Sequence, residues 1–310
     1  MPEQHEFMDM VETILVTGAT GTVGSEVVKQ LLASSSSDHN NIRAAVHSQN
    51  KADKLRHDNN KEVEIVNIDY NKPETISHAL SNVDKLFLPT LPSPNMTNIS
   101  SSVVKEAKKN GVKYIVKLSV MAADAEPGTI IGRLHRQEEK IIEESGITHT
   151  FLRSGAFMQN FINFFGQTIK NQNAFYLPAR DGKVSFVDVR DIAAVAAKLL
   201  TKNNGNRGQQ YENKAYDITG PEALSYSQAA EIISKEIGRK ISYVDIPEED
   251  ARKAMKGIGM EDWLIDAMME FYNIIRAGYA SQITNTVEQI IGRNPTSFAQ
   301  FVRDHSVSFN

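Results

Sequence analysis

The stretch TILVTGATGTVG, residues 13–24, decides the fold of this chain. It joins a short apolar run, residues 13–17, through closely spaced glycines to a pattern of helical spacing over residues 25–33. A strand, a glycine turn and a helix in this order begin a βαβ unit that binds a dinucleotide. The serine-rich residues 34–41 are expected to form a loop, and residues 42–47 a second strand.

Each glycine of the turn has its own expected role. Gly18 permits the sharp turn, Gly21 lets the backbone approach a pyrophosphate, and Gly24 lets the helix pack closely on the strand. The free N–H groups and the positive dipole end of the helix then face the phosphates. A glycine turn that binds no ligand is the alternative. The residues expected to bind the cofactor here are Gly18, Thr20, Gly21, Thr22, Val23 and Gly24.

The end of the second strand favours NADP(H), with NAD(H) as the second choice. An NAD site usually has Asp or Glu at this place for the ribose 2′-hydroxyl, but this chain has His47. With Arg43 nearby, Ser48 and Lys51 offer donors and positive charge for a 2′-phosphate, although they could equally be an ordinary polar loop. Asp69, after the third expected strand, could accept from the adenine amino group or stabilise a turn.

Strands and helices alternate over the first half of the chain, which predicts an α/β fold with a doubly wound, Rossmann-type parallel sheet. After residue 220 helices dominate, with 241–244 as the only clear strand, and we expect a smaller, mainly helical substrate lobe. The expected division is a polar tail, 1–11; a Rossmann domain, 12–153, which also receives 184–203 and 215–219; and a small lobe from 154–183 and 220–310.

Composition excludes several classes of function. The 310 residues are 41% hydrophobic and 23% charged, with a formal net charge of −4 and no cysteine. A chain of this kind is expected to be globular and cytoplasmic, with no disulfide, no affinity for nucleic acid and no membrane span. The eight histidines show no metal-ligand spacing, so no metal is expected.

Several motifs together resemble the NmrA-like family of atypical short-chain dehydrogenases, which includes NADPH-dependent quinone reductases and isoflavone reductases. The matching pieces follow one another in order along most of the chain. One departure is Ser154, where the family often has Pro. The pieces are VTGATGTVG at 16–24, YIVKLS at 114–119, TFLRSGAFMQN at 150–160, VDVRDIA at 187–193 and GRNPTSF at 292–298.

The resemblance implies where the cofactor lies. Leu88, Pro89 and Thr90, at the end of the fourth strand, would border its ribose, and Phe157 and Met158 would lie beside the nicotinamide. The residues themselves agree with this, because ligands of open α/β sheets bind at the carboxyl ends of the strands.

The candidate catalytic residues are His135, Lys117 and Ser119. None of the nine tyrosines is followed four positions later by Lys, so the Tyr-x-x-x-Lys chemistry of the larger superfamily is absent. In the isoflavone reductases a Lys occupies the place that corresponds to His135. Glu138 or Glu139, at i+3 and i+4, could orient the imidazole or raise its pKa. A solvated charged helix face is the alternative.

Two apolar stripes are candidate walls of an acceptor pocket, or else ordinary core. One stripe runs from Phe157 to Phe165 and the other from Met260 to Tyr272. Two functions follow: NADPH-dependent reduction of a small flat acceptor such as a quinone or carbonyl compound, or a redox sensor that binds NADP without turnover. The expected partner is a small-molecule substrate. A homodimer, or a protein partner for the sensor, stays open.

Overall fold

The computed structural model describes residues 11–38, 40–47, 55, 63–201 and 209–310. A seven-stranded sheet forms its centre, with every neighbouring pair parallel and the order β3-β2-β1-β4-β5-β6-β9. The order reverses between β1 and β4, as in a Rossmann sheet, so the doubly wound prediction is confirmed. The strands are β1 Thr13–Val16, β2 Asn41–Val46, β3 Glu64–Asn67, β4 Lys85–Leu88, β5 Tyr114–Val120, β6 Thr148–Ser154 and β9 Lys214–Ile218.

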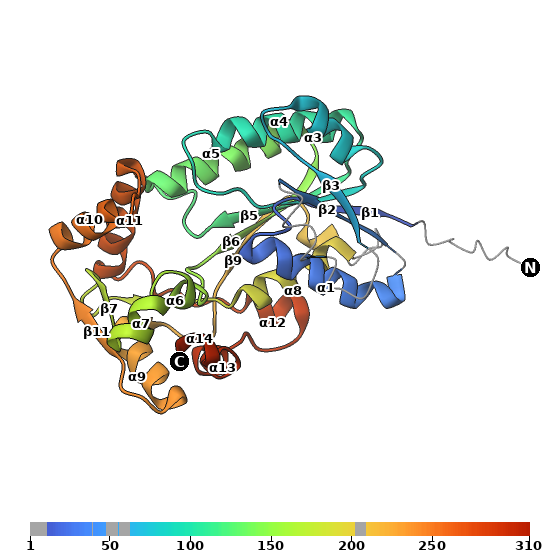
Figure 1. Ribbon diagram of the computed structural model, residues 1–310. Helices are drawn as coiled ribbons and strands as arrows, with labels where there is room; N and C mark the ends of the chain where they lie inside the picture. Colours follow the sequence, from blue (N-terminus) through green and yellow to red (C-terminus); the bar gives the residue numbers. More distant parts are fainter. Residues whose placement is uncertain (1–10, 39, 48–54, 56–62, 202–208) are drawn as a thin grey trace, which may run out of the picture.

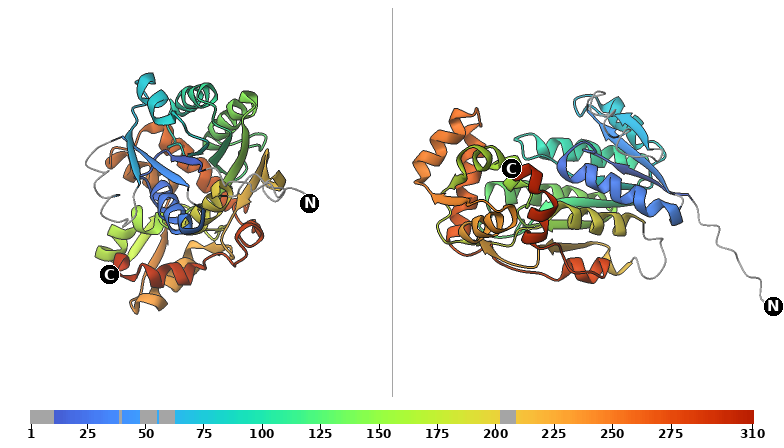
Figure 2. Two further views of the ribbon diagram at one scale, coloured as in Figure 1. Left: turned by 90° about the vertical axis from the view of Figure 1, so that its right-hand side faces the viewer. Right: turned by 60° about the horizontal axis from the view of Figure 1, so that its bottom comes forward.

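Helices cover both faces of this sheet. α3 (Pro73–Leu80), α4 (Met96–Lys109) and α5 (Ile130–Ser145) lie on one face, and α1 (Thr22–Asp38) and α8 (Val189–Thr201) lie on the other (Figure 1). The left view of Figure 2 shows the same two layers from another side, with the sheet between them. None of the described helices is both long and apolar enough to cross a membrane.

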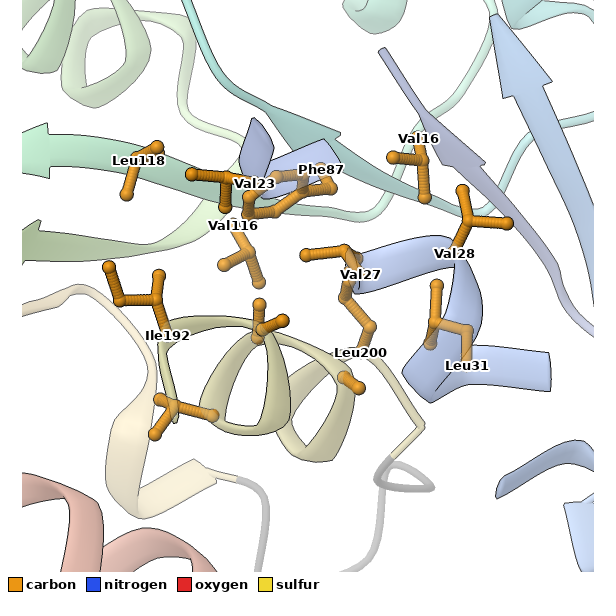
Figure 3. Packing of buried hydrophobic residues seen from close by; sticks show 14 of the residues in the cluster. Val16, Val23, Val27, Val28, Leu31, Phe87, Val116, Leu118, Ile192 and Leu200 are labelled. Carbon is orange, nitrogen blue, oxygen red and sulfur yellow. The ribbon is translucent and has the colours of Figure 1, made fainter. Parts of the chain in front are cut away.

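The core on the α1–α8 face consists of aliphatic side chains from helices and strands that lie far apart in the sequence. Val27 and Leu31 of α1 and Ile192 of α8 pack toward Val16 and Val116 of the sheet (Figure 3). All five are fully buried. Burial of each such side chain contributes about 1.5–3 kcal/mol, so this layer holds the glycine turn at the start of α1 firmly against the sheet.

The predicted loop over residues 34–41 is wrong, because α1 continues to Asp38 and β2 begins at Asn41. Ser34 donates its hydroxyl hydrogen to the carbonyl of Gln30, a contact that serine makes within a helix. Serine has only a moderate helix propensity, but adding residues to an existing helix costs less than starting one. The packed apolar turns at the start of α1 therefore allow the helix to continue over the serines.

A second lobe follows β6. Its elements are α6 Asn160–Asn163, α7 Gly166–Gln172, β7 Ala174–Leu177, β8 Lys183–Val184, β10 Leu224–Ser225, α9 Tyr226–Ile237, β11 Ser242–Asp245, α10 Glu248–Gly257, α11 Asp262–Arg276, α13 Phe298–Asp304 and α14 Ser306–Phe309. β11 pairs with β7 and β8 with β10. The expectation of one clear strand after residue 220 missed β10, and β7, which lies before residue 220, was not predicted at all. The apolar run of residues 184–189 predicts a further strand before a helix, but this is wrong, since β8 ends at Val184 and α8 begins at Val189.

Two buried aspartates at the start of α8 connect the sheet to the C-terminal segment. Asp191 accepts hydrogen bonds from the backbone N–H and hydroxyl of Thr296 and pairs with Arg293 at 2.7 Å. Asp188 pairs with Arg190, which also reaches Asp304 of α13. The VDVRDIA and GRNPTSF motifs therefore meet in space. α12 (Thr286–Ile291), which directly precedes the GRNPTSF motif, packs on the α8 side of the sheet.

Candidate cofactor and proton-transfer site

The glycine turn has the geometry that a pyrophosphate requires. Gly18 has φ +58°, a left-handed conformation that favours glycine. A Cβ at Gly24 would overlap the carbonyl oxygen of Gly18, so α1 starts against the turn only because residue 24 is glycine. Hydrogen bonding in α1 begins with Ser25, which donates to the Gly21 carbonyl at 3.0 Å. The N–H groups of residues 22–24 belong to the first turn, which has no acceptor within a helix, and they can bind phosphate oxygens.

The end of β2 holds an exposed His47, whose Nδ1 lies 3.1 Å from the carbonyl of Ile68. Arg43 is engaged elsewhere: its guanidinium binds Glu64 and the carbonyls of Ala79 and Ser81, near the end of α3. It is therefore held away from the carboxyl edge of the sheet. Ser48 and Lys51 lie outside the described residues.

Asp69 has a turn role in this structure. Its Oδ1 accepts the N–H of Asn71 at 3.0 Å, and its backbone exchanges hydrogen bonds with the hydroxyl of Thr75. This is the second of the two roles that the sequence left open. A contact with adenine stays a prediction.

A buried ionic cluster lies between β5 and α5, level with the carboxyl end of β4. Lys117 Nζ lies 3.0 Å from Glu138 Oε2 of α5 and donates to Thr90 Oγ1 at 2.9 Å. Thr90 and Ser100 also donate to the Glu138 carboxylate. Alternation along β5 explains the position of the lysine, because residues 117 and 119 face α5 while their neighbours face the α1–α8 core. Glu138 therefore joins β4, α4 and β5 to α5.

His135 is buried in the same cluster. Its side chain is 4% exposed, and its Nδ1 lies 3.3 Å from Glu138 Oε2 without the alignment of a full hydrogen bond. Burial lowers the pKa of His135, and the Lys117 charge lowers it further, against the smaller opposite effect of Glu138. Glu138 does act to raise this pKa, as expected of a nearby carboxylate, but burial and the Lys117 charge outweigh it, so the net shift is downward and the imidazole is neutral near pH 7. The solvated charged face is wrong, since Glu138 and Glu139 are also buried.

Glu139, the next residue of α5, belongs to a separate hydrogen-bond network with side chains of β5 and β6. Its carboxylate binds Arg153 of β6 through two hydrogen bonds of 2.9 and 2.8 Å and accepts from Ser119 at 2.7 Å. Arg136 pairs with the same carboxylate at 3.1 Å. The two neighbouring glutamates thus hold different strands, and Glu138 alone lies beside His135.

Electrostatics keep the Glu138 carboxyl ionised in spite of its burial. Burial by itself would raise its pKa, but the Lys117 charge and the contacts of His135 and Ser100 outweigh this and hold the pKa at about 2. Burial lowers the pKa of Lys117, whereas Glu138 opposes that change. Each ion therefore depends on the other for its charge.

The polar cluster is next to the glycine turn. A Cβ at Gly18 would lie 3.2 Å from Pro89 Cγ, and the residue after Pro89 is the Thr90 that binds both Lys117 and Glu138. Leu88 is fully buried at the end of β4. On the other side, Phe157 forms a bridge to Val187 and is partly buried, while Met158 is fully buried in the core of the second lobe.

The two apolar stripes are mainly core. Phe161 is fully buried among other rings, including Phe175 and Phe298, at centroid distances of 5.6 and 4.8 Å. Met269 and Tyr272 of α11 are buried in the same core. The pocket interpretation is wrong for these side chains, whereas Phe164 is 66% exposed.

Two residues of these buried networks, one bound to Glu138 and one to Glu139, were missed from the sequence. Ser100 is a polar residue on the buried face of α4, at helical spacing from Met96 and Val103, and this pattern could have indicated a buried hydroxyl with a partner. Arg153 lies in a quoted motif, but nothing in its spacing shows that its partner is Glu139.

Fold and site together define a Rossmann-type dinucleotide-binding protein with a buried ionic cluster beside the cofactor turn. Over residues 10–302 the chain matches the NmrA-like family, and it belongs to that family. It is 38% identical to the NAD(P)H azoreductase of Xenophilus azovorans, over 96% of this chain and 99% of that protein. It is 28% identical to quinone oxidoreductase 2 of Escherichia coli, over 93% of this chain and 97% of that protein.

Solved structures agree with this assignment. The NADPH complex of the E. coli quinone oxidoreductase superposes with a TM-score of 0.81 and 28% identity, over 96% of this chain and 100% of that chain. The NADP(H) complex of a Citrobacter triphenylmethane reductase gives a TM-score of 0.79 and 27% identity, over 94% and 99% of the two chains. The expected family and fold are confirmed.

Proposed function

We propose that this protein is an NAD(P)H-dependent oxidoreductase that uses NADPH to reduce a small, flat, conjugated acceptor such as a quinone or an azo compound. The observation that supports the proposal is the close approach of Pro89 to the glycine turn, since a Cβ at Gly18 would lie 3.2 Å from Pro89 Cγ, and the next residue, Thr90, binds Lys117 in the cluster that contains His135. NADPH supplies the hydride when it is bound. The relatives named above, which reduce azo compounds, quinones and triphenylmethane dyes, support this class of acceptor.

In this proposal the chain's own residues bind the cofactor, exclude water from the place of hydride transfer and supply a proton. The N–H groups of residues 22–24 bind the pyrophosphate, and His47 contacts the 2′-phosphate. Ser48 and Lys51 stay predicted contacts of the same phosphate and lie outside the described residues. Leu88, Pro89 and Thr90 border the ribose, and Phe157 borders the nicotinamide. Apolar neighbours of this kind exclude water from the place of transfer.

His135 is proposed as the residue that supplies a proton to the reduced acceptor. Glu138 faces its Nδ1, which leaves Nε2 as the nitrogen that exchanges a proton. Lys117 and Ser119 are buried and already bound to Glu138 and Glu139, so we assign them positioning roles. Because burial lowers the pKa of His135, its protonated fraction and the proton-dependent rate rise as pH falls below about 6.5.

The test is to follow NADPH oxidation with a quinone, an azo dye and a triphenylmethane dye. We expect turnover of at least one of them, and a loss of about 100-fold in His135→Ala for an acceptor that needs a proton. His78→Ala, at an exposed position of α3, is the control and should keep the wild-type rate. Tight NADPH binding without turnover of any acceptor would contradict the reductase and favour the redox sensor.

A further inference from the structure

One contact joins the second lobe to the helix that carries His135. Glu270 of α11 accepts the backbone N–H of Ile130, the first residue of α5, at 2.6 Å. The two residues are 140 positions apart in the chain. Figure 1 shows α11 beside one end of α5, where the second lobe meets the sheet layer.

The chemistry of this contact is favourable. The first N–H groups of a helix have no partner within it, and they carry the positive end of the helix dipole. The side chain of the N-cap residue Thr129 accepts the N–H of Gly132, and the N–H of Ile130 is bound by Glu270 instead. A carboxylate that accepts such a donor forms a charge-assisted hydrogen bond, which is stronger than a neutral one.

α11 is fixed in its own lobe at the other end. A Cβ at Gly182 would overlap the carbonyl of Ile275, so the two backbones touch. Arg276 donates to the carbonyl of Pro178 and pairs with Glu248 of α10 at 3.3 Å. Glu270 lies six residues before Arg276, about 9 Å along the helix axis. α11 therefore spans the distance from the core of the second lobe to α5.

We infer that Glu270 is a positioning residue that clasps α11 to α5 and so sets where the second lobe closes on the acceptor. This rests on the proposed function, because it assumes that the acceptor lies between the nicotinamide and this lobe. His135 follows Ile130 by five residues, about 7.5 Å along α5, so the clasp fixes the helix of the proton donor as well. Met268 and Phe271, partly buried on either side of Glu270, are the α11 side chains whose position depends on it.

The experiment compares Glu270→Ala and Glu270→Gln with a matched control at the start of the same helix. Glu261→Gln is that control, because its carboxylate accepts the indole N–H of Trp263, two residues away, at 2.7 Å. The readouts are the KM for a quinone, the Kd for NADPH and the amide exchange rate of Ile130 in the NADPH complex. In Glu270→Ala we expect exchange at Ile130 to quicken about tenfold or more and the quinone KM to rise about fivefold, with the Kd for NADPH within about twofold.

Glu270→Gln keeps an acceptor oxygen and should restore part of both effects, whereas Glu261→Gln should change neither. Unchanged exchange at Ile130 in Glu270→Ala would overturn the clasp. Faster exchange with an unchanged quinone KM would overturn its role at the acceptor. Ile130 exchange requires no turnover, so a wild-type protein that reduced no quinone would refute the proposed function separately from the clasp.

Discussion

Lys117 Nζ of β5 lies 3.0 Å from Glu138 Oε2 of α5, and neither side chain has any solvent exposure. Removing one member would leave the other as a buried charge without its partner, which costs about 3–5 kcal/mol. Glu138→Gln should therefore lower the free energy of unfolding by roughly that amount, measured by urea denaturation. Adding Lys117→Met should restore much of the loss.

Glu143→Gln is the control for this pair. Glu143 lies on the same helix and pairs with Arg136 at 2.8 Å, but its side chain is 39% exposed, so the expected loss is under about 1 kcal/mol. A double variant as unstable as the sum of the single variants would show that the two charges are not coupled.

The pH dependence of stability should reveal the buried imidazole. The folded-state pKa of His135 lies below 6.5, so the unfolded chain binds its proton first, and stability falls as pH drops below about 6.5. His135→Asn should reduce this loss by at most about 1.4 kcal/mol per pH unit and leave the part due to His305, whose pKa burial also lowers, while His78→Asn, at an exposed site, should change nothing. Equal slopes in wild type and His135→Asn would refute the neutral imidazole.

A second window belongs to Glu138. Its folded pKa of about 2 lies below the ordinary value of 4.5, so its contribution is complete above pH 4.5 and disappears as pH falls toward 2. Glu138→Gln should therefore reduce the acid loss below pH 4.5, and the remainder belongs to other carboxyls with a lowered pKa, such as Glu139 and Asp124.

Gly24 should tolerate no side chain. Because a Cβ there would overlap the Gly18 carbonyl, Gly24→Ala should weaken NADPH binding at least about tenfold and cost about 1–3 kcal/mol of stability. A Cβ at Gly257, at the end of α10, would meet no atom of the described residues within 4 Å, and Gly257→Ala should be neutral or stabilising by about 0.5–1 kcal/mol. Calorimetric titration and thermal unfolding measure both effects. Normal NADPH affinity in Gly24→Ala would remove the steric argument.

The Rossmann half of the fold was predictable because its signals are local. The glycine turn, the alternation of apolar runs and the Gly146 that ends α5 lie within a few residues of what they specify. β7 was missed because it is short and pairs with β11, nearly seventy residues later. The residues next to β7 in the sequence therefore do not indicate what it packs against.

The sequence predicted which strand ends and which helix carry the site residues, but it did not predict which side chains bind one another. His135 and Lys117 could be named from the sequence, yet the choice of Glu138 over Glu139 as their partner required the rotation of α5 on the sheet. One residue of helix turns a side chain by about 100°, enough to send Glu139 to Ser119 and Arg153. The sequence also did not show that this face of α5 is buried, and burial is the main cause of the lowered pKa of His135, with the Lys117 charge adding to it.

Asp191 provides the last prediction, because it ties the C-terminal segment to the cofactor domain. Asp191→Ala would remove the acceptor of the Thr296 N–H and the partner of Arg293, and it should lower stability by about 2–4 kcal/mol. The loss should expose the segment after residue 292 to protease first, since its anchor on α8 is gone. Asp304→Asn, whose partly exposed pair with Arg190 is screened by water, should cost under about 1 kcal/mol. Equal protease resistance of the two variants would mean that the apolar contacts of Phe298 and Phe301, rather than Asp191, hold this segment in place.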